Sequence, residues 1–303
     1  MILSPIEASI KRKIEAVGTP LKDWNINIYR GVLTGLNEAF IISTEKRDKI
    51  LANCADEDER RRTEELIRPI LRGRDIKKYR YDWAGLWIIA TFPSKHYAIE
   101  QYPSVKKHLL SFATSYLLDN HNDEILNHHL EEFCYKKLSQ SGEFVIINGA
   151  PVLDKNGNKE RSRKKTSNKW FEVQDSISYW DDFYKQKIVW GNLNLSAAYS
   201  LAPEGMFLNA PSNMIVPASR SLLCVLNSKL ADYYIRSLGV TRNGGYFEYK
   251  PMFIEQLPVP TNIDDEPLNK EDITSNDIDV LVYQLYGLTE EEINHIEHSS
   301  IDS

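Results

Sequence analysis

The segment from Asn25 to Thr44, NINIYRGVLTGLNEAFIIST, combines the patterns that decide the fold class. Polar and apolar residues alternate from Asn25 to Tyr29, which predicts a half-buried strand, and the apolar run from Ala39 to Ile42 predicts a second, buried strand. Glycines between the two runs indicate a loop. The charged sequence from Thr44 to Leu71 predicts helix in two pieces, with Pro69 at the turn out of it. Short strands interleaved with long helices favour an α+β fold.

The same mixture extends in both directions from this segment. An amphipathic helix is expected up to Val17, a strand from Trp83 to Phe92, and the longest helical stretch from Ser104 to Leu138. Two Asn-Gly turn dipeptides between Phe144 and Lys165 predict hairpins. The predicted architecture is therefore one of short mixed β-sheets and a hairpin meander packed with long helices.

The C-terminal third is expected to be mainly helical. A helix is predicted from Arg220 to Leu238, and another from Asp277 to Tyr286 with its apolar residues facing inward. Thr289 and Glu292 have the spacing of a capping box, which predicts the start of a last helix.

Composition bounds the class of protein. The chain has 303 residues, of which 42% are hydrophobic, so it can bury a core. No apolar run approaches the roughly 18 residues that a membrane span needs, and a cytoplasmic protein is expected. The three cysteines form no CxxC pair, and the histidines near His108 lie on a helix in directions that suit no metal cage, so no metal site is predicted.

Several catalytic motifs are missing from the sequence. Neither GxGxxG nor GxxxxGK[ST] occurs, which leaves dinucleotide and nucleotide chemistry without support. The chain contains no Pro-Pro dipeptide, so the Asn-Pro-Pro-aromatic loop of amino-directed DNA methyltransferases is not present in it.

Charge is distributed unevenly along the chain. The total of 37 basic and 43 acidic residues gives a net charge of −6, but the segment from Thr261 to Ser303 holds twelve acidic residues and one lysine. The first 260 residues therefore carry a net charge of +5. A polyanionic partner is compatible with this body, whereas the acidic tail is expected to face away from it.

Two basic segments indicate a nucleic-acid surface. The stretch from Arg60 to Arg80 and the stretch from Lys155 to Trp170 each have a net charge of about +6, as a surface that contacts phosphates requires. Arg60–Arg62 are expected to balance the acids just before them on a solvated helix. The loop from Arg242 to Tyr246 offers a guanidinium, an amide and an aromatic ring, which suits contact with bases, although a plain turn would have a similar sequence. The candidate DNA-binding residues are Arg30, Arg72, Arg74, Lys77, Arg161, Arg163, Lys164, Lys165, Lys169, Arg242, Asn243 and Tyr246.

Two alternatives to a DNA-recognition module stay open. Asp232, Glu248 and Lys250 have the residue types and order of a metal-dependent nuclease site, although such triplets often arise by chance. A protein-interaction or scaffold subunit would share the same composition, and it would bind no duplex at low salt.

Five motifs resemble, in order, those of the TaqI-like C-terminal specificity domain, the target-recognition part of adenine-specific DNA methyltransferases and type IIG restriction-modification enzymes. The opening segment, YRGVLTGLNEAF from Tyr29 to Phe40, is similar to the family's "RGxxTGxNxAF". The other four segments resemble the family's later motifs. They are RPILRGRDI from Arg68, YPSVKKHL from Tyr102, KWFE from Lys169 with KIVW from Lys187, and NSKL from Asn227 with LPVP from Leu257.

The resemblance implies a role and a division of the chain. Residues 1–23 are expected to be a helical connector to an upstream domain, residues 24–260 a DNA target-recognition domain, and residues 261–303 an acidic helical tail that packs on the body. It also implies that the chain itself is non-catalytic and binds no cofactor. Its partners would be double-stranded DNA and a methyltransferase domain or subunit that binds S-adenosylmethionine.

Overall fold

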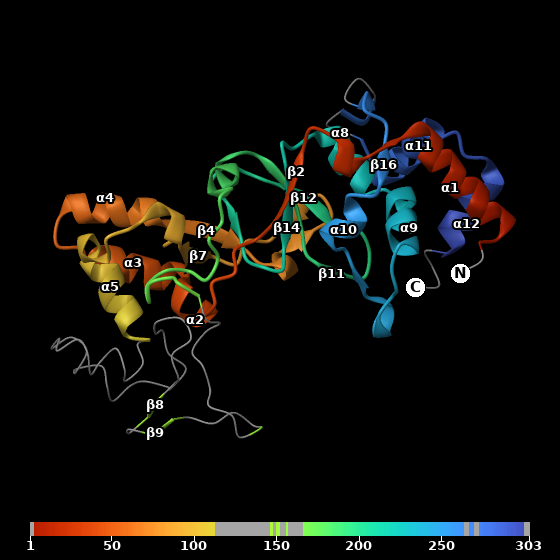
Figure 1. The fold of residues 1–303 in the computed structure, drawn as a ribbon. Coiled ribbons are helices and arrows are strands. Elements are labelled where there is room, and N and C mark those ends of the chain that lie inside the picture. The colour runs from red at the N-terminus through yellow and green to blue at the C-terminus, as the bar shows by residue number, and fades with distance from the viewer. Residues whose placement is uncertain are drawn as a thin grey trace. The chain divides into compact units, whose positions relative to one another are not determined.

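The structure is a computed structural model that describes residues 3–112, 146–147, 150–151, 156, 166–263, 267–269 and 273–299 (Figure 1). The chain divides into two compact units that interleave along the sequence. Unit 1 comprises residues Met1–Gly31, Leu71–Asp82 and Asp181–Ser303, and unit 2 comprises Val32–Ile70 and Trp83–Trp180.

Unit 1 is built on a four-stranded antiparallel sheet. The strand order is β12 (Tyr199–Ala202), β10 (Lys187–Trp190), β14 (Asn213–Val216) and β2 (Asn27–Arg30). All four residues of β10 and of β14 are buried, whereas β2 at the edge is exposed at both ends. The alternation that predicts a strand at Asn25–Tyr29 therefore marks an edge strand with one face on the core.

Helices pack around this sheet. They are α1 (Pro5–Val17), α8 (Arg220–Leu226), α9 (Lys229–Ser237), α10 (Pro251–Ile254), α11 (Ser275–Leu285) and α12 (Glu290–Ser299). Their buried apolar residues, Ile10, Leu222, Ile235, Ile278 and Ile296 among them, form one hydrophobic cluster with Trp190 and Tyr199 of the sheet. Among the described residues, no helix is long and apolar enough to cross a membrane.

Short ribbons complete unit 1. β1 (Thr19–Pro20) pairs with β16 (Pro258–Val259), β5 (Ile76–Lys77) with β6 (Arg80–Tyr81), and β11 (Leu193–Asn194) with β15 (Phe247–Glu248), all antiparallel. The remaining elements are β13 (Phe207–Leu208) and the 3-10 turns η1 (Leu21–Asp23), η2 (Gly73–Asp75), η6 (Trp180–Tyr184), η7 (Asn243–Gly245) and η9 (Pro267–Asn269).

The described part of unit 2 combines a small antiparallel sheet with three longer helices. β7 (Leu86–Ile89) pairs with β4 (Ile67–Leu71) on one side and with β3 (Ile41–Ser43) on the other. The helices are α3 (Thr44–Ala52), α4 (Glu57–Leu66) and α5 (Pro103–Leu110), and the shorter elements are α2 (Asn37–Phe40), η3 (Pro93–Lys95), η4 (Ile99–Gln101), β8 (Ile146–Ile147) and β9 (Ala150–Pro151).

Glu59 connects two helices of unit 2 through one buried carboxylate. Its Oε2 accepts from the Ala55 backbone N–H at 2.7 Å, and its Oε1 accepts from the Ser104 N–H in the first turn of α5 at 2.9 Å. These backbone donors outweigh burial and hold the pKa of Glu59 below its ordinary value. A single side chain thus caps the beginnings of α4 and α5.

The α+β prediction is confirmed, and several local predictions are corrected. Pro69 does not end a helix: α4 stops at Leu66, and Pro69 lies in strand β4 opposite Trp87. The helix predicted over Arg220–Leu238 is broken in two, because the Asn227 side chain bonds the backbone of Tyr199 and Ser228 caps α9.

Other local predictions are confirmed. Thr289 and Glu292 form the capping box of α12, with the Thr289 N–H donating to Glu292 at 2.8 Å. The first predicted hairpin exists, since Ile146 pairs with Pro151 and Ile147 with Ala150. The remainder of that meander and most of the helix predicted over Ser104–Leu138 lie outside the described residues.

Candidate nucleic-acid interface

Of the eight candidate DNA-binding residues that the structure describes, seven lie in unit 1 and one lies in unit 2. Arg161, Arg163, Lys164 and Lys165 lie outside the described residues. Lys169 belongs to unit 2, where it is exposed and its Nζ lies 5.6 Å from the centre of the Phe171 ring. The unit 1 candidates are Arg30, Arg72, Arg74, Lys77, Arg242, Asn243 and Tyr246.

One end of the four-stranded sheet gathers cations from separate parts of the chain. Arg30 is the last residue of β2 and is exposed. Its partner in the sheet is Asn213, which in turn lies opposite Trp190, the last residue of β10. Arg30, Asn213 and Trp190 therefore form a row at one end of the sheet.

A contact between two glycine backbones brings a third segment to this end. Gly191 follows Trp190, and a Cβ added to Gly191 would lie 2.9 Å from the carbonyl oxygen of Gly73, closer than real side chains approach. Only glycine allows this approach, which brings η2 and the cations around it to the row. We call the exposed side chains of Arg30, Arg74 and Lys77 the basic sheet end.

Arg72 has a different environment from its basic neighbours. Its Nε and Nη2 donate to the two carboxylate oxygens of Asp75 at 3.0 and 2.7 Å, and its backbone N–H donates to Asp75 at 2.9 Å. Hydrogen bonding to Asp75 raises the pKa of Arg72, so its charge is permanent. Because Asp75 is buried and engaged with Arg72, this pair fixes the shape of the turn, while Arg74 and Lys77 remain exposed.

The loop from Arg242 to Tyr246 is attached to the same part of unit 1. The Trp190 indole N–H donates to the Tyr249 carbonyl at 2.7 Å, and the Tyr249 N–H donates to Asn192 at 2.7 Å. From this junction the β11/β15 ribbon extends to the loop, where the Arg242 N–H donates to the Tyr246 carbonyl at 2.6 Å. The loop is thus the tip of a ribbon whose base lies beside the basic sheet end.

The loop side chains are available to solvent. The Arg242 side chain is 62% exposed and Tyr246 is 41% exposed, while Asn243 is exposed between them. Glu248 accepts from Arg242 at 2.6 Å and from Lys250 at 2.5 Å, and these two cations lower its pKa. The carboxylate neutralises part of the positive charge and orients both cations.

The solvent-facing side of the ribbon carries exposed apolar residues beside Glu248, which lies opposite Leu193, and sequence reasoning missed these apolar residues. Leu193 and Leu195 are 51% and 54% exposed, and Tyr246 belongs to the same side, because Phe247 between the exposed residues is fully buried. A free antiparallel ribbon ordinarily carries polar residues on this side. The sequence Leu-Asn-Leu alone does not reveal this orientation, since it depends on which partner strand covers the other face.

The three residues of the nuclease hypothesis have other partners. Asp232 accepts from the Tyr249 hydroxyl at 2.5 Å and pairs with Arg236 at 3.4 Å, whereas Glu248 lies between Arg242 and Lys250. Burial raises the pKa of Asp232, which disfavours the charged form that a metal ligand needs. In the part of the chain that the structure describes, no cluster of three or more His, Cys, Asp and Glu side chains could hold a metal ion.

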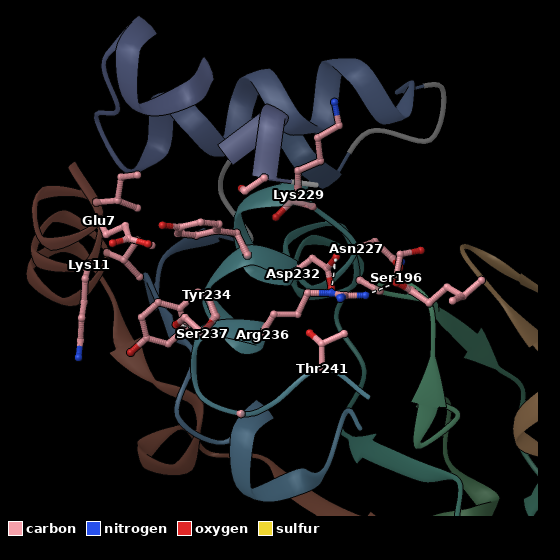
Figure 2. A pocket seen from close by; sticks show the side chains of 18 of the residues that line it. Glu7, Lys11, Ser196, Asn227, Lys229, Asp232, Tyr234, Arg236, Ser237 and Thr241 are labelled. Atoms are coloured by element: carbon pink, nitrogen blue, oxygen red, sulfur yellow. Dashed lines mark hydrogen bonds and ion pairs between the residues drawn. The ribbon is translucent and has the colours of Figure 1, made fainter. Parts of the chain in front are cut away.

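A cavity of about 610 Å³ lies between α1 and α9 within unit 1 (Figure 2). Glu7 and Lys11 border it on the α1 side, and Asp232, Tyr234 and Arg236 border it on the α9 side. Figure 2 shows Asp232 and Arg236 directed toward each other, so their charges are engaged together at the wall of the cavity.

Comparison with known proteins identifies the class. Residues 68–259, more than half of the chain, match the model of the TaqI-like C-terminal specificity domain. The chain therefore belongs to this family of specificity domains of restriction-modification enzymes, and this membership supports a role in recognising DNA. The match includes η2, the ribbon and the Arg242–Tyr246 loop, while Arg30 lies before it.

Two solved structures have a similar arrangement. The type IIL restriction-modification enzyme MmeI, in complex with DNA, has a TM-score of 0.48 and 9% identity over 94% of this chain and 36% of its own. The type IIG restriction endonuclease BpuSI has a TM-score of 0.49 and 14% identity over 97% of this chain and 32% of its own. The chain spans about a third of the length of each. Among curated proteins, none matches the chain.

Proposed function

We propose that this chain is the sequence-recognition module of an adenine-specific DNA methyltransferase or a related type IIG restriction-modification enzyme. The observation that carries the proposal is the basic sheet end, where the Gly73–Gly191 contact brings the segment of Arg74 and Lys77 to the end of the sheet that carries Arg30. Cations from separate segments, gathered at one end of a sheet, suit a DNA backbone, because phosphate contacts fix the register of a duplex.

The proposal divides the contacts into two kinds. Arg30, Arg74 and Lys77 would contact phosphates, which carry no sequence information. Arg242, Asn243 and Tyr246 would contact bases, since an arginine can bond a guanine edge bidentately and an asparagine an adenine edge. Further phosphate or base contacts would come from the remaining candidates, Lys169, Arg161, Arg163, Lys164 and Lys165.

The methylation step would belong to a partner domain or subunit. A methyltransferase that acts on adenine has to turn the base out of the duplex, and a second lobe has to hold the duplex in register meanwhile. We assign that holding role to this chain. S-adenosylmethionine would bind the catalytic partner, which is where the Asn-Pro-Pro-aromatic loop would reside.

The test is selection from a pool of duplexes with a randomised central stretch. The full chain is expected to enrich one sequence motif from this pool at moderate salt. Lys77→Ala should keep that motif, weaken binding to all duplexes alike and lower the salt slope by about one. Lys49→Ala on α3, where the side chain is 67% exposed and pairs with Glu45, is the matched control and should change neither.

Two results would contradict the proposal. A wild-type chain that enriches no motif would refute sequence recognition. Absence of duplex binding even at low salt would favour a protein-interaction subunit instead.

A further inference from the structure

The β11/β15 ribbon is too short to hold its own shape. Its ladder consists of two residue pairs, Leu193 with Glu248 and Asn194 with Phe247. An isolated two-stranded ribbon is marginally stable even when it is longer. The Arg242–Tyr246 loop at its tip also contains Gly244 and Gly245, both at positive φ, which allow many conformations. A defined loop position therefore requires support from outside the ribbon.

Helix α9 supplies that support through a polar network. Arg236 and Asp232 lie one helical turn apart, with the Arg236 Nε 3.4 Å from Asp232 Oδ2. The Tyr249 hydroxyl donates to Asp232 Oδ1 at 2.5 Å and accepts from Arg236 Nε at 3.2 Å. The Arg236 Nη2 donates to the Leu195 carbonyl. Figure 2 shows Asp232 and Arg236 on α9, with a dashed line between their side chains.

The network holds both ends of the ribbon, because the strands are antiparallel and their last residues lie at opposite ends of the ladder. Leu195 is the first residue after β11, and Tyr249 is the first residue after β15. Arg236 also belongs to the last turn of α9, from which the chain enters the loop. The Arg236–Tyr249 hydrogen bond therefore closes the base of the segment that contains Arg242, Asn243 and Tyr246.

Burial strengthens the hydrogen bonds of this network. The side chains of Arg236 and Asp232 are 13% and 16% exposed, and Tyr249 is 1% exposed. Charge-assisted hydrogen bonds are stronger away from water, and removing one member leaves the others buried without a partner. Burial raises the pKa of Tyr249, which keeps the proton on the tyrosine oxygen.

We infer that Asp232, Arg236 and Tyr249 form a clamp that positions the β11/β15 ribbon and, through it, the base-contacting loop. They are positioning residues for sequence discrimination and touch no DNA themselves. The inference rests on the proposed function, since it gives the loop its task. It assigns to Asp232 a role other than the nuclease chemistry that its sequence context suggests.

Tyr249→Phe tests the clamp with a minimal change, and the unit offers a matched control. Tyr283 is 3% exposed and its hydroxyl donates to Glu297 at 3.3 Å, beside Lys229, so Tyr283→Phe removes a hydroxyl from a similar trio that links α11 and α12 to the beginning of α9. Each full-length variant is used to select from the randomised duplex pool. Hydrogen exchange is followed at the amides of residues 193–195 and 247–249.

The clamp predicts a specific pattern. Tyr249→Phe should speed exchange in the ribbon and lower discrimination about tenfold at the same motif positions that Arg242→Ala degrades. Affinity for scrambled duplexes should stay unchanged. Tyr283→Phe should leave the motif and ribbon exchange at wild-type values. Arg236→Lys, which retains the charge, should lose less discrimination than Arg236→Met.

Three results would overturn the inference. A Tyr249→Phe chain with the wild-type motif and wild-type ribbon exchange would show that the clamp positions nothing. An equal loss of discrimination in Tyr283→Phe would indicate general destabilisation. A wild-type chain without any motif would refute the proposed function, and the positioning role would fall with it.

Discussion

Two basic regions of the molecule differ in what surrounds their guanidinium groups. On α4 of unit 2, Arg61 pairs with Asp58 at 2.8 Å and Arg60 pairs with Glu64 at 3.3 Å, so the helix supplies its own acids at three- and four-residue spacing. At the basic sheet end of unit 1, Asp75 is the single acidic residue between Leu71 and Arg80, and Arg72 occupies it.

The difference teaches how to recognise a phosphate-binding surface. Positive charge along the sequence indicates such a surface only where the local acids are already engaged with other cations. The α4 arginines form a solvated, balanced helix face, as their sequence predicts. Arg74 and Lys77 follow a turn that has used its acid for structure, which leaves their charge directed to solvent.

The largest expected effect comes from removing Asp75, the buried acid whose pairing with Arg72 distinguishes the basic sheet end from α4. Asp75→Ala leaves the half-buried Arg72 guanidinium without its carboxylate and removes the acceptor of the Arg72 backbone N–H. We expect a loss of roughly 3–5 kcal/mol in the free energy of unfolding. Denaturant titration measures it.

Asp58→Ala on α4 is the matched control, because its partner Arg61 is exposed. We expect a change below about 0.5 kcal/mol there. Equal losses in the two variants would remove the distinction between a structural and a solvated arginine–acid pair.

The next effect concerns the scaffold of unit 2. His108 is buried, its Nε2 lies 2.8 Å from the Ala39 carbonyl, and burial lowers its pKa to about 4 from 6.5. The unfolded chain binds the proton more tightly, so stability is complete above pH 6.5 and falls by about 3 kcal/mol as the pH drops to 4. Unfolding measured across this range should show the slope, and His108→Gln should flatten it without changing the DNA motif. If His108→Gln had the same pH dependence of unfolding as the wild type, titratable groups other than His108 would cause the slope.

A smaller effect separates base contacts from phosphate contacts. Arg242→Ala should cost roughly 1–3 kcal/mol on the selected motif and nothing on scrambled duplexes. Competition binding with both duplexes measures this difference. A uniform loss on the two duplexes would make Arg242 a phosphate ligand like Lys77.

The smallest effect is expected on α4. Arg61→Ala removes a side chain that is 68% exposed, together with one surface ion pair. Unfolding free energy should change by less than about 0.5 kcal/mol and duplex affinity by less than about twofold. A larger loss of duplex affinity would extend the DNA surface to helix α4.

Much of the fold could be predicted because the signals are local. The Thr289–Glu292 capping box and the first hairpin depend on neighbouring residues, and both are present. The prediction of a helix up to Pro69 was wrong, because the local sequence does not distinguish a proline in a strand from a proline after a helix. The distinction depends on the pairing of Pro69 with Trp87 in the sheet. The break at Asn227 depends on Tyr199, which is far away in sequence.

The candidate site was less accessible to sequence reasoning. Charge and loop composition were enough to nominate Arg74, Lys77 and Arg242. Their grouping depends on the Gly73–Gly191 approach and on the register from Trp190 to Arg30, which no local pattern encodes. The clamp was missed for the same reason, since Tyr249 meets Asp232 only after the ribbon folds back on α9.

The most direct test of a DNA-recognising sheet end is the salt dependence of duplex binding for two charge reversals. Arg74→Glu with Lys77→Glu alters the basic sheet end, and Arg60→Glu with Arg61→Glu alters α4. We expect the first pair to weaken binding to every duplex by about a hundredfold and to lower the salt slope by about two, because two phosphate contacts are lost. The second pair should leave both quantities near their wild-type values. Equal salt slopes for the two double variants would contradict the claim that unit 1 carries the phosphate-binding surface.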